Sequence, residues 1–452
     1  MKPLLSQITS IVGESYVIES PADYPAYAVQ GRTPALVVAP GSAEELAHVV
    51  ATAYAAGVAV VPRGGGTMQP WGHPPVGDFL VVQTTRLNRV RTYEPDDLTI
   101  SVEAGMTMEY LDETLAPNGQ MLPLDVPIPA RSTIGGILAT AMDGPRRLGY
   151  GTSRDLLIGV QVVEASGRTS KAGGMVVKNV SGFDMMKLYT GSLGSLAIIV
   201  SANFKLIPRA RAAATIACAF GSQAAAFALA RAIHESQLVP VAVEYLFGPH
   251  PQPLSLSGRG ESTPPSPARG EGGWGGEGSL LVVRAEGLPA AVERHVRDVS
   301  AMAERAGASG VTVMRDAAHE SVWEAINNLP QSALVDGDEL LLRLSCLPAS
   351  LERALADAES LAARHGLGMR VAARALSGLA YLRVRGDDAG AQRQFHADLL
   401  GRWTQLALLA GPPALKAEVP IWGTEIPNLS LVRRIKQEFD PENRLNPGRY
   451  VV

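Results

Sequence analysis

The sequence predicts an α+β protein with more than one domain. In the first half, short apolar β-branched runs and helical patterns follow one another in an irregular order, which argues against a sheet built from repeated strand–helix units. The first glycine run follows a strand and leads into another strand. The second half alternates strands and helices. At 452 residues the chain exceeds the size at which a single core keeps growing, so we expect two or three domains.

Residues 62–67 (PRGGGT) place three glycines directly after the apolar strand 58–62. Because glycine lacks a Cβ, such a loop lets the backbone approach a ligand closely, and its N–H groups can converge on a phosphate. A nicotinamide-binding loop needs a helix immediately after its glycines. Here residues 68–75 (MQPWGHPP) are too rich in proline for a helix, and strand 79–83 follows. We infer a strand–loop–strand phosphate cradle, with a plain tight turn as the alternative.

The other elements of the first half follow from apolar spacing and capping residues. Ser42 and Glu45 form a capping-box pattern, and Thr107 can cap a second helix. Prolines exclude regular structure before Ser132, where a capping hydroxyl, two glycines and small residues begin a segment against which a flat ligand can lie. We therefore expect a helix and an extended stretch over 4–20, strands over 34–40, 58–62, 79–83, 98–104, 156–163 and 194–200, and helices over 43–56 and 108–116.

The composition excludes several classes of protein. A net charge of −4 argues against a nucleic-acid surface, which needs a basic stripe. The longest apolar runs are far shorter than the ~20 residues of a membrane span, and the N-terminus lacks the apolar core of a signal peptide. We therefore expect a cytoplasmic protein without direct membrane insertion. Cys218 and Cys346 are too few for an iron–sulfur cluster, which takes about four thiolates, so any cluster must lie on another chain.

From about residue 34 to 208 the chain resembles the FAD-binding domain of the vanillyl-alcohol oxidase and p-cresol methylhydroxylase superfamily. The matching motifs are PRGGGT (62–67), EAG (103–105), TIGG (133–136) and the strand 194–200. A closer resemblance links the chain to the FAD-binding E subunits of bacterial glycolate oxidases. It rests on YGTSRD (150–155), KNVSGFD (178–184) and FDPENRLNPGR (439–449).

The superfamily resemblance implies a role for each loop. Residues 63–68 should donate backbone N–H groups to the FAD pyrophosphate, and residues 133–136 should line the diphosphate and the isoalloxazine face. Residues 197–199 should pack near the adenine, and residues 446–449 should close over the ring. Some relatives tether FAD through a histidine beside the glycine loop. This chain has Thr67 there, and His73 lies too far along, so non-covalent FAD is expected.

The same resemblance identifies a set of expected FAD contacts. They are Pro62, Arg63, Gly64, Gly65, Gly66, Thr67, Met68, Ser132, Thr133, Ile134, Gly135, Gly136, Ala139, Thr140, Gly149, Ser153, Gly194, Ala197, Ile198, Ile199, Asn446 and Arg449. Several also have a purely structural interpretation. Gly194 can end a helix, Thr133 can serve only as a helix cap, and residues 446–448 (NPG) can form only a turn.

The second half repeats strands and helices in a way that is typical of a ferredoxin-like cap. We expect strands over 212–220, 239–247, 279–284, 339–346, 368–375 and 378–384, and helices over 222–236, 288–306, 316–328, 348–365 and 388–409. Residues 248–278 are mostly glycine, proline, serine and charged residues, which predicts a disordered insertion between two strands, with a proline-rich docking segment as the alternative. The expected division is a FAD-binding domain over 1–210, a cap over 211–430, and a C-terminal segment over 431–452 that returns to the flavin.

The chain departs from the related catalytic flavin subunits at their metal motif, His-x-Gly-Asp-Gly-Asn-x-His. It carries only HGL at 365–367, and neither His234 nor His319 has a second histidine at helical spacing. No metal is therefore expected, and no residue stands out as catalytic.

The resemblance implies an FAD-dependent subunit of a glycolate (2-hydroxy-acid) oxidoreductase. Its expected partners are a second flavin subunit, an iron–sulfur subunit and a small 2-hydroxy acid, and any membrane association would come through the partner subunits. The alternatives are a self-sufficient FAD-dependent D-2-hydroxy-acid dehydrogenase and a non-catalytic assembly subunit.

Overall fold

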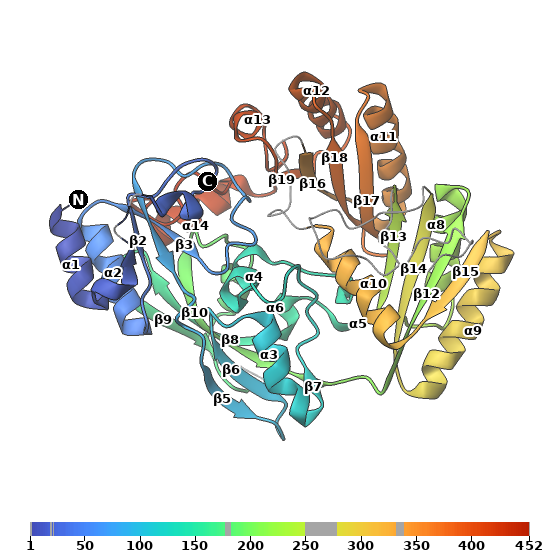
Figure 1. Cartoon of the computed structure of the whole chain (residues 1–452), viewed down its shortest axis with the longest axis horizontal. Coiled ribbons are helices and arrows are strands. Elements are labelled where there is room, and N and C mark those ends of the chain that lie inside the picture. The colour runs from blue at the N-terminus through green and yellow to red at the C-terminus, as the bar shows by residue number, and fades with distance from the viewer. Residues whose placement is uncertain are drawn as a thin grey trace.

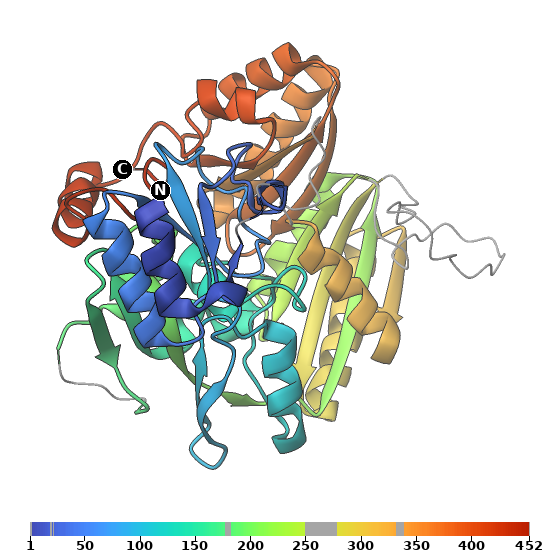
Figure 2. The same cartoon turned by 60° about the vertical axis from the view of Figure 1, so that its left-hand side comes forward.

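The computed structural model describes residues 2–18, 20, 22–176, 182–248, 278–330 and 339–451. It contains two lobes that lie side by side (Figure 1). The N-terminal lobe holds a four-stranded and a five-stranded sheet, and the second lobe is built on one eight-stranded sheet. After the second lobe the chain returns, so that its last helix lies beside the N-terminal lobe (Figure 2).

The four-stranded sheet contains the strand that leads into the glycine loop. Its order is β1 (Val17–Ile18), β2 (Leu36–Val38), β4 (Phe79–Gln83) and β3 (Ala59–Arg63). Helices α1 (Lys2–Val12) and α2 (Ala43–Ala55) pack on one face of it. As predicted, Ser42 caps α2, because its Oγ accepts from the Glu45 N–H at 3.1 Å. The Glu45 carboxylate accepts in return from the Gly41 N–H at 2.7 Å.

The five-stranded sheet is antiparallel throughout and carries the second half of the site. Its order is β5 (Val90–Glu94), β6 (Thr99–Glu103), β10 (Ala197–Lys205), β8 (Leu157–Glu164) and β9 (Thr169–Gly173). Its helices are α3 (Met108–Leu115), α4 (Ile134–Thr140), α5 (Arg147–Tyr150), α6 (Ser153–Leu156) and α7 (Met186–Tyr189). The predicted caps are confirmed, since Thr107 caps α3 and Thr133 caps α4. A two-stranded ribbon of β7 (Gln120–Met121) and β11 (Ile207–Pro208) leads to the second lobe.

The second lobe contains two ferredoxin-like units rather than the single one expected. The sheet order is β15 (Gly310–Met314), β12 (Ala212–Phe220), β14 (Ser279–Gly287), β13 (Ala242–Phe247), β17 (Gly368–Arg374), β18 (Leu379–Arg385), β16 (Glu339–Ser345) and β19 (Leu406–Ala410). In chain order, β12–β15 and β16–β19 each follow the β-α-β-β-α-β pattern. The units join where β13 pairs with β17, so one continuous antiparallel sheet results.

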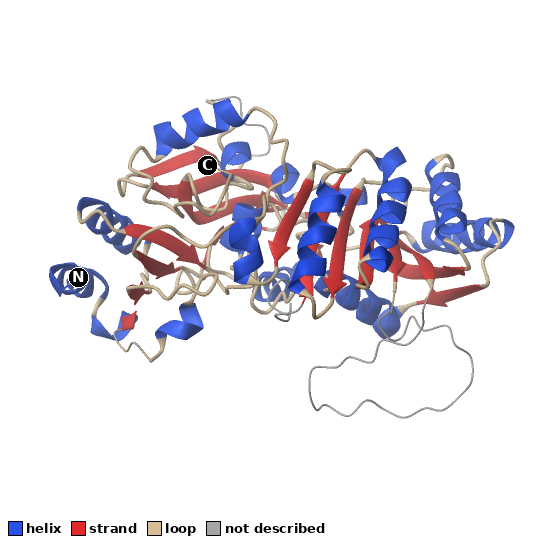
Figure 3. Cartoon of the chain, turned by 90° about the horizontal axis from the view of Figure 1, so that it is seen from above, coloured by secondary structure: helices blue, strands red, loops and turns tan. Residues whose placement is uncertain are grey.

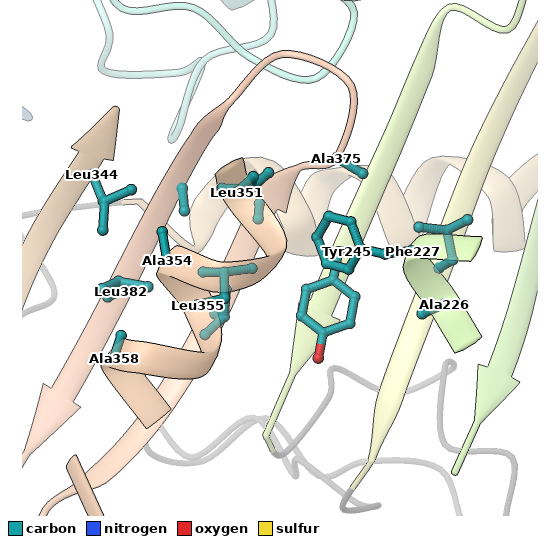
Figure 4. Packing of buried hydrophobic residues seen from close by; sticks show 14 of the residues in the cluster. Ala226, Phe227, Tyr245, Leu344, Leu351, Ala354, Leu355, Ala358, Ala375 and Leu382 are labelled. Atoms are coloured by element: carbon teal, nitrogen blue, oxygen red, sulfur yellow. The ribbon is translucent and has the colours of Figure 1, made fainter. Parts of the chain in front are cut away.

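Four helices of the second lobe cover one face of its sheet (Figure 3). They are α8 (Gln223–His234), α9 (Pro289–Arg305), α11 (Leu351–Arg364) and α12 (Ala389–Leu400). Phe227 of α8 packs on Tyr245 of β13, and Leu355 of α11 lies beside them over the adjoining strands (Figure 4). Helix α10 (Asp316–Asn328), at the bounds predicted, buries Trp323 against the opposite face.

One predicted helix of the second lobe is wrong at its end. The expected helix 388–409 stops at Leu400, and Leu406–Ala410 forms strand β19 instead. All five residues of β19 are buried, and the strand pairs with β16 at the edge of the sheet. Because Leu406–Ala410 pairs with β16 and is buried on both faces, these sheet contacts decide its conformation, although its apolar spacing is also compatible with a helix. The predicted insertion 248–278 lies outside the described residues except for its two terminal glycines.

A buried lysine fixes the returning C-terminal segment. Helices α13 (Pro413–Glu418) and α14 (Leu429–Phe439) follow the second lobe. From α14, Lys436 Nζ donates to Ser195 O at 2.9 Å, to Leu445 O at 3.0 Å and to the Asp440 carboxylate at 2.5 Å. Asp440 also accepts from the Arg444 and Leu445 N–H groups. Leu445 then lies beside β3, directly below the glycine loop.

In the part of the chain that the structure describes, no helix combines the length and the apolarity that a membrane crossing requires.

We predict that Lys436→Met lowers the free energy of unfolding by about 3–5 kcal/mol, because it leaves the buried Asp440 carboxylate without its cation. Urea unfolding measures the change. The matched control is Lys187→Met, which breaks an exposed pair with Asp184 and should shift stability by less than about 1 kcal/mol. Equal stabilities of the two variants would contradict the role assigned to Lys436.

We predict that replacing residues 249–277 by the dipeptide Asn-Gly leaves the thermal midpoint and flavin content unchanged. Phe247 and Ser279 are already paired in register, so a short turn can join β13 to β14. Differential scanning fluorimetry and the flavin absorbance check this. Loss of a co-purifying partner on deletion would instead support the docking-segment alternative.

Candidate functional site

Most of the predicted site residues meet at a cavity between the two sheets of the N-terminal lobe. We call it the glycine-loop cavity. Four segments line it: the loop after β3, the start of α4, the turn before β10 with its first residues, and the C-terminal segment. The predicted residues on its wall are Pro62, Arg63, Gly64, Gly65, Gly66, Thr67, Met68, Thr133, Gly135, Gly136, Ala139, Thr140, Gly194, Ala197, Ile198, Ile199, Asn446 and Arg449.

Two of the three loop glycines are required by packing. A Cβ at Gly64 would lie 2.0 Å from Thr133 Oγ1, and a Cβ at Gly65 would lie 1.8 Å from the carbonyl oxygen of Arg131. Both distances are far inside van der Waals contact, so only glycine fits. The third, Gly66, has a φ of +75°, which L side chains rarely adopt. The loop therefore lies directly against the segment that begins α4.

Two arginines stand near this loop without a carboxylate partner among the described residues. Arg63 Nη1 donates to Ala26 O at 2.7 Å, and its guanidinium lies over the Tyr27 ring. Its Nε is buried and makes no hydrogen bond. Arg131 Nη2 donates to Gly65 O at 3.0 Å. Burial lowers the pKa of Arg63, with Arg131 contributing in the same direction. An unpaired cation with a free donor beside a glycine loop fits an anionic group such as a pyrophosphate.

The C-terminal segment closes one side of the cavity. Asn446 Nδ2 donates to Leu193 O at 2.5 Å, whereas its Oδ1 is buried without a partner. Arg449 Nη2 donates to Gln69 O at 2.7 Å and also to Trp71 O. The burial of Arg449 lowers its pKa to about 10. These contacts hold the tail against the loop that follows the three glycines.

A second buried cation supports the same loop from α13. Lys416 is fully buried, and its Nζ donates to Pro70 O at 2.5 Å and to Leu409 O at 3.1 Å. Burial lowers the pKa of Lys416 to about 7, and the nearby Arg449 adds to that effect. Three consecutive carbonyls of the loop, from residues 69 to 71, thus accept hydrogen bonds from cations of the second lobe and the tail.

Four predicted contacts lie elsewhere. Ser132 is buried below the loop, where its Oγ donates to Pro127 O, and Ile134 packs in the core of the five-stranded sheet. Gly149 touches the second lobe, with its N–H donating to Val241 O at 3.2 Å. Ser153 begins α6, and its N–H donates to the Asp143 carboxylate. Ser132, Ile134 and Ser153 are buried, and Gly149 lies close against Val241, so each of the four has a structural role.

Four lining residues were not predicted: Gln69, Trp71, Thr84 and Leu193. The sequence offered a signal for Trp71, because a large aromatic side chain within a loop rich in glycine and proline is expected to be buried against the protein. Leu193 takes a positive φ of 53°, which its sequence does not suggest. Gln69 lies in the loop after the glycines, whereas Thr84 follows β4 and donates its N–H to Arg63 O at 2.9 Å.

The described wall of the cavity contains no histidine, aspartate or glutamate. His319 lies elsewhere, hydrogen-bonded to Thr215 at 2.8 Å, and burial lowers its pKa to about 4. Burial lowers the pKa of His396 to about 4 as well. Among the described residues, no three His, Cys, Asp or Glu side chains gather as a metal-binding group. The cavity can therefore bind and orient a ligand, but its own wall offers no carboxylate or imidazole as a general base.

Comparison with known proteins identifies the family. Residues 34–185 match the model described as "FAD binding domain", and residues 209–408 and 424–450 match "FAD linked oxidases, C-terminal domain". The glycolate oxidase subunit GlcD of Bacillus subtilis (strain 168) is 25% identical over 434 residues, covering 92% of this chain and 88% of that protein. The glycolate oxidase subunit GlcE of Escherichia coli (strain K12) is 32% identical over 158 residues, covering 35% and 45%.

A solved structure of p-cresol methylhydroxylase superimposes with a TM-score of 0.73 at 14% identity, covering 99% of this chain and 96% of that one. This likeness confirms the predicted α+β fold with a p-cresol methylhydroxylase-type FAD-binding domain. Together the two family models account for most of the chain. The chain therefore belongs to the FAD-linked oxidases, and it is an FAD-dependent oxidoreductase with FAD as its cofactor.

Proposed function

We propose that this chain is the FAD-binding subunit of a multi-subunit 2-hydroxy-acid oxidoreductase of the glycolate oxidase type, and that it corresponds to the E subunit. The observation that carries the proposal is the glycine-loop cavity, which offers unpaired donors for an anionic dinucleotide but no acid–base residue on its described wall. The similarity to GlcE, at 32% identity, and the tail motif at 439–449 support the E-type assignment.

In this proposal the cavity residues divide by the part of FAD that they contact. Residues 63–68 donate backbone N–H groups to the pyrophosphate, and the free Nε of Arg63 adds a charged donor. Thr133, Gly135, Gly136, Ala139 and Thr140 line the ring face. Residues 197–199 pack toward the adenine, and residues 446–449 close over the ring. The binding is non-covalent, because the described wall lacks a histidine that could form a tether.

Bound FAD supplies the redox chemistry by accepting two electrons from the hydroxy acid. The chain binds the flavin, orients it and excludes water. Its two cysteines cannot hold a cluster, because Cys218 is a buried free thiol whose pKa burial raises to about 12, and Cys346 is the only other. We therefore infer that electrons leave to an iron–sulfur partner subunit and that a second flavin subunit completes the complex.

We propose the domain division 1–210, 211–430 and 431–452 for this function. The assembled complex is proposed to be cytoplasmic, with any membrane association made by partner subunits.

We predict that Gly65→Val abolishes FAD retention while the second lobe stays folded, because any Cβ there meets the Arg131 carbonyl. The ratio of flavin to protein absorbance after gel filtration measures retention, and circular dichroism measures folding. The matched control is Gly221→Ala, whose Cβ meets nothing within 4 Å. A normal FAD content in the Gly65→Val protein would refute the assignment of this loop.

We predict that the chain purified alone is yellow and free of iron, and that glycolate reduces its flavin at a catalytic rate only after co-purification with its partner subunits. Flavin and iron counts on both preparations, with anaerobic absorbance after addition of glycolate or D-lactate, test this. Rapid bleaching of the isolated chain would instead establish a self-sufficient dehydrogenase. A colourless preparation would instead indicate an assembly subunit.

A further inference from the structure

Strand β15 (Gly310–Met314) forms one end of the eight-stranded sheet, on the side of the second lobe that lies away from the N-terminal lobe (Figure 1). It pairs antiparallel with β12 along one side, and no described strand pairs with its other side. In an antiparallel pair the main-chain N–H and C=O groups of alternate residues point away from the partner. The outer side of β15 therefore presents main-chain donors and acceptors with which another strand can pair.

The other edges of the described sheets are protected in recognisable ways. Strands β1, β7 and β11 are only two residues long. The outer side of β3 is covered by the chain at Leu445, and the Leu408 N–H of β19 donates to Ile421 O at 2.8 Å. Strand β5 contains Arg91, and β9 contains Lys171. Short, covered or charged edges resist pairing with another chain.

Strand β15 has none of these protections. Its five residues (GVTVM) include no charged residue and no proline, and Val313 is 40% exposed. The first charged residue after the strand is Arg315, which forms an ion pair with Glu293 of α9 at 2.9 Å and is thus neutralised within the chain. Natural proteins rarely leave an uncharged edge strand free, so this edge indicates a partner.

The sequence of the strand matches a second copy of itself. Two antiparallel β15 strands related by a two-fold axis at Thr312 place Val311 of each copy opposite Val313 of the other. Opposed β-branched residues stabilise a strand pair, and so do two opposed threonines. In this register Arg315 faces Ser309, so no like charges meet at the strand ends. Because the other described edges are protected, β15 finds its complement only in another β15, which closes the assembly at two copies.

We propose that two copies of this chain form a two-fold dimer by antiparallel pairing of their β15 strands, which joins the two eight-stranded sheets into one continuous sheet. The pairing takes place on the far side of the second lobe from the N-terminal lobe, so each copy keeps its own glycine-loop cavity (Figure 1). The inference rests on the sheet edges alone and does not depend on the substrate or the partner subunits proposed above.

Sedimentation velocity of the FAD-loaded full chain tests the assembly over protein concentrations from about 1 to about 100 µM. We expect the mass to rise from that of one chain to that of two, with no larger species. A single chain at every concentration would overturn the proposal, and so would a series of growing oligomers.

Variants of Thr312 test the two-fold axis, because this residue faces its own copy. Thr312→Lys and Thr312→Glu should each weaken the dimer at least about tenfold, since like charges then lie directly opposite each other. An equimolar mixture of the two variants should regain the dimer, because lysine then faces glutamate. Mixing cannot repair a general loss of stability, so this rescue reports on the pairing itself.

The matched control is Thr92→Lys, the same substitution at an exposed position of edge strand β5, and it should leave the dimer unchanged. A dimer that persists in Thr312→Lys would overturn the proposal. A mixture of folded, FAD-loaded Thr312 variants that stays monomeric would overturn it as well.

If the Thr312 variants fail to fold, the unmodified protein decides. Amide hydrogen exchange at residues 310–314 should slow at least about tenfold from the lowest to the highest concentration, because outward N–H groups become hydrogen-bonded in the dimer. Residues 90–94 of β5 are the internal control and should exchange equally fast throughout. Exchange at 310–314 that does not depend on concentration would overturn the proposal. Protection that appears only in the co-purified complex would also overturn it, because a partner subunit would then occupy the edge.

Discussion

The N-terminal lobe depends on the close approach between the glycine loop and the segment that begins α4. Gly64 and Gly65 lie so near Thr133 and Arg131 that no side chain fits between them. The loop belongs to the four-stranded sheet, and α4 packs with the five-stranded sheet. The contact therefore joins the two halves and leaves a cavity between them whose wall includes glycines of both segments. A flavin pyrophosphate needs such a wall, because backbone N–H groups can then reach it directly.

Buried cations extend this arrangement to the rest of the chain. Lys416 and Arg449 bind the carbonyls that follow the glycine loop, and Lys436 binds the carbonyls of Ser195 and Leu445. Each of these hydrogen bonds satisfies a main-chain acceptor, and Pro70 O accepts from the Gln30 side chain as well. The cost is the desolvation of the cation, which lowers the pKa of each of the three groups. The C-terminal tail, hundreds of residues from the loop in sequence, is thereby fixed at the site.

Local patterns predicted the elements well where a cap or a long amphipathic period was present. Ser42, Thr107 and Thr133 cap helices as expected, and α10 has its predicted bounds. Patterns failed where pairing partners decide the structure, as at β19, because an apolar run of five residues is equally compatible with a helix end or a buried strand. Trp71 and Arg343 meet only because two lobes come together, and nothing near either residue in sequence signals the other.

The sequence by itself determined the α+β class, the strand–loop–strand order around the three glycines and the family to which the chain belongs, because these depend on local spacing and on motifs. Only the tertiary structure shows why glycine is needed at these loop positions. The three glycines were expected to make room for a phosphate, and the structure shows that two of them make room for the segment at residues 131–133. It alone decided that Ser132, Ile134, Gly149 and Ser153 lie away from the cavity. These features arise from contacts between segments distant in sequence, which no local pattern encodes.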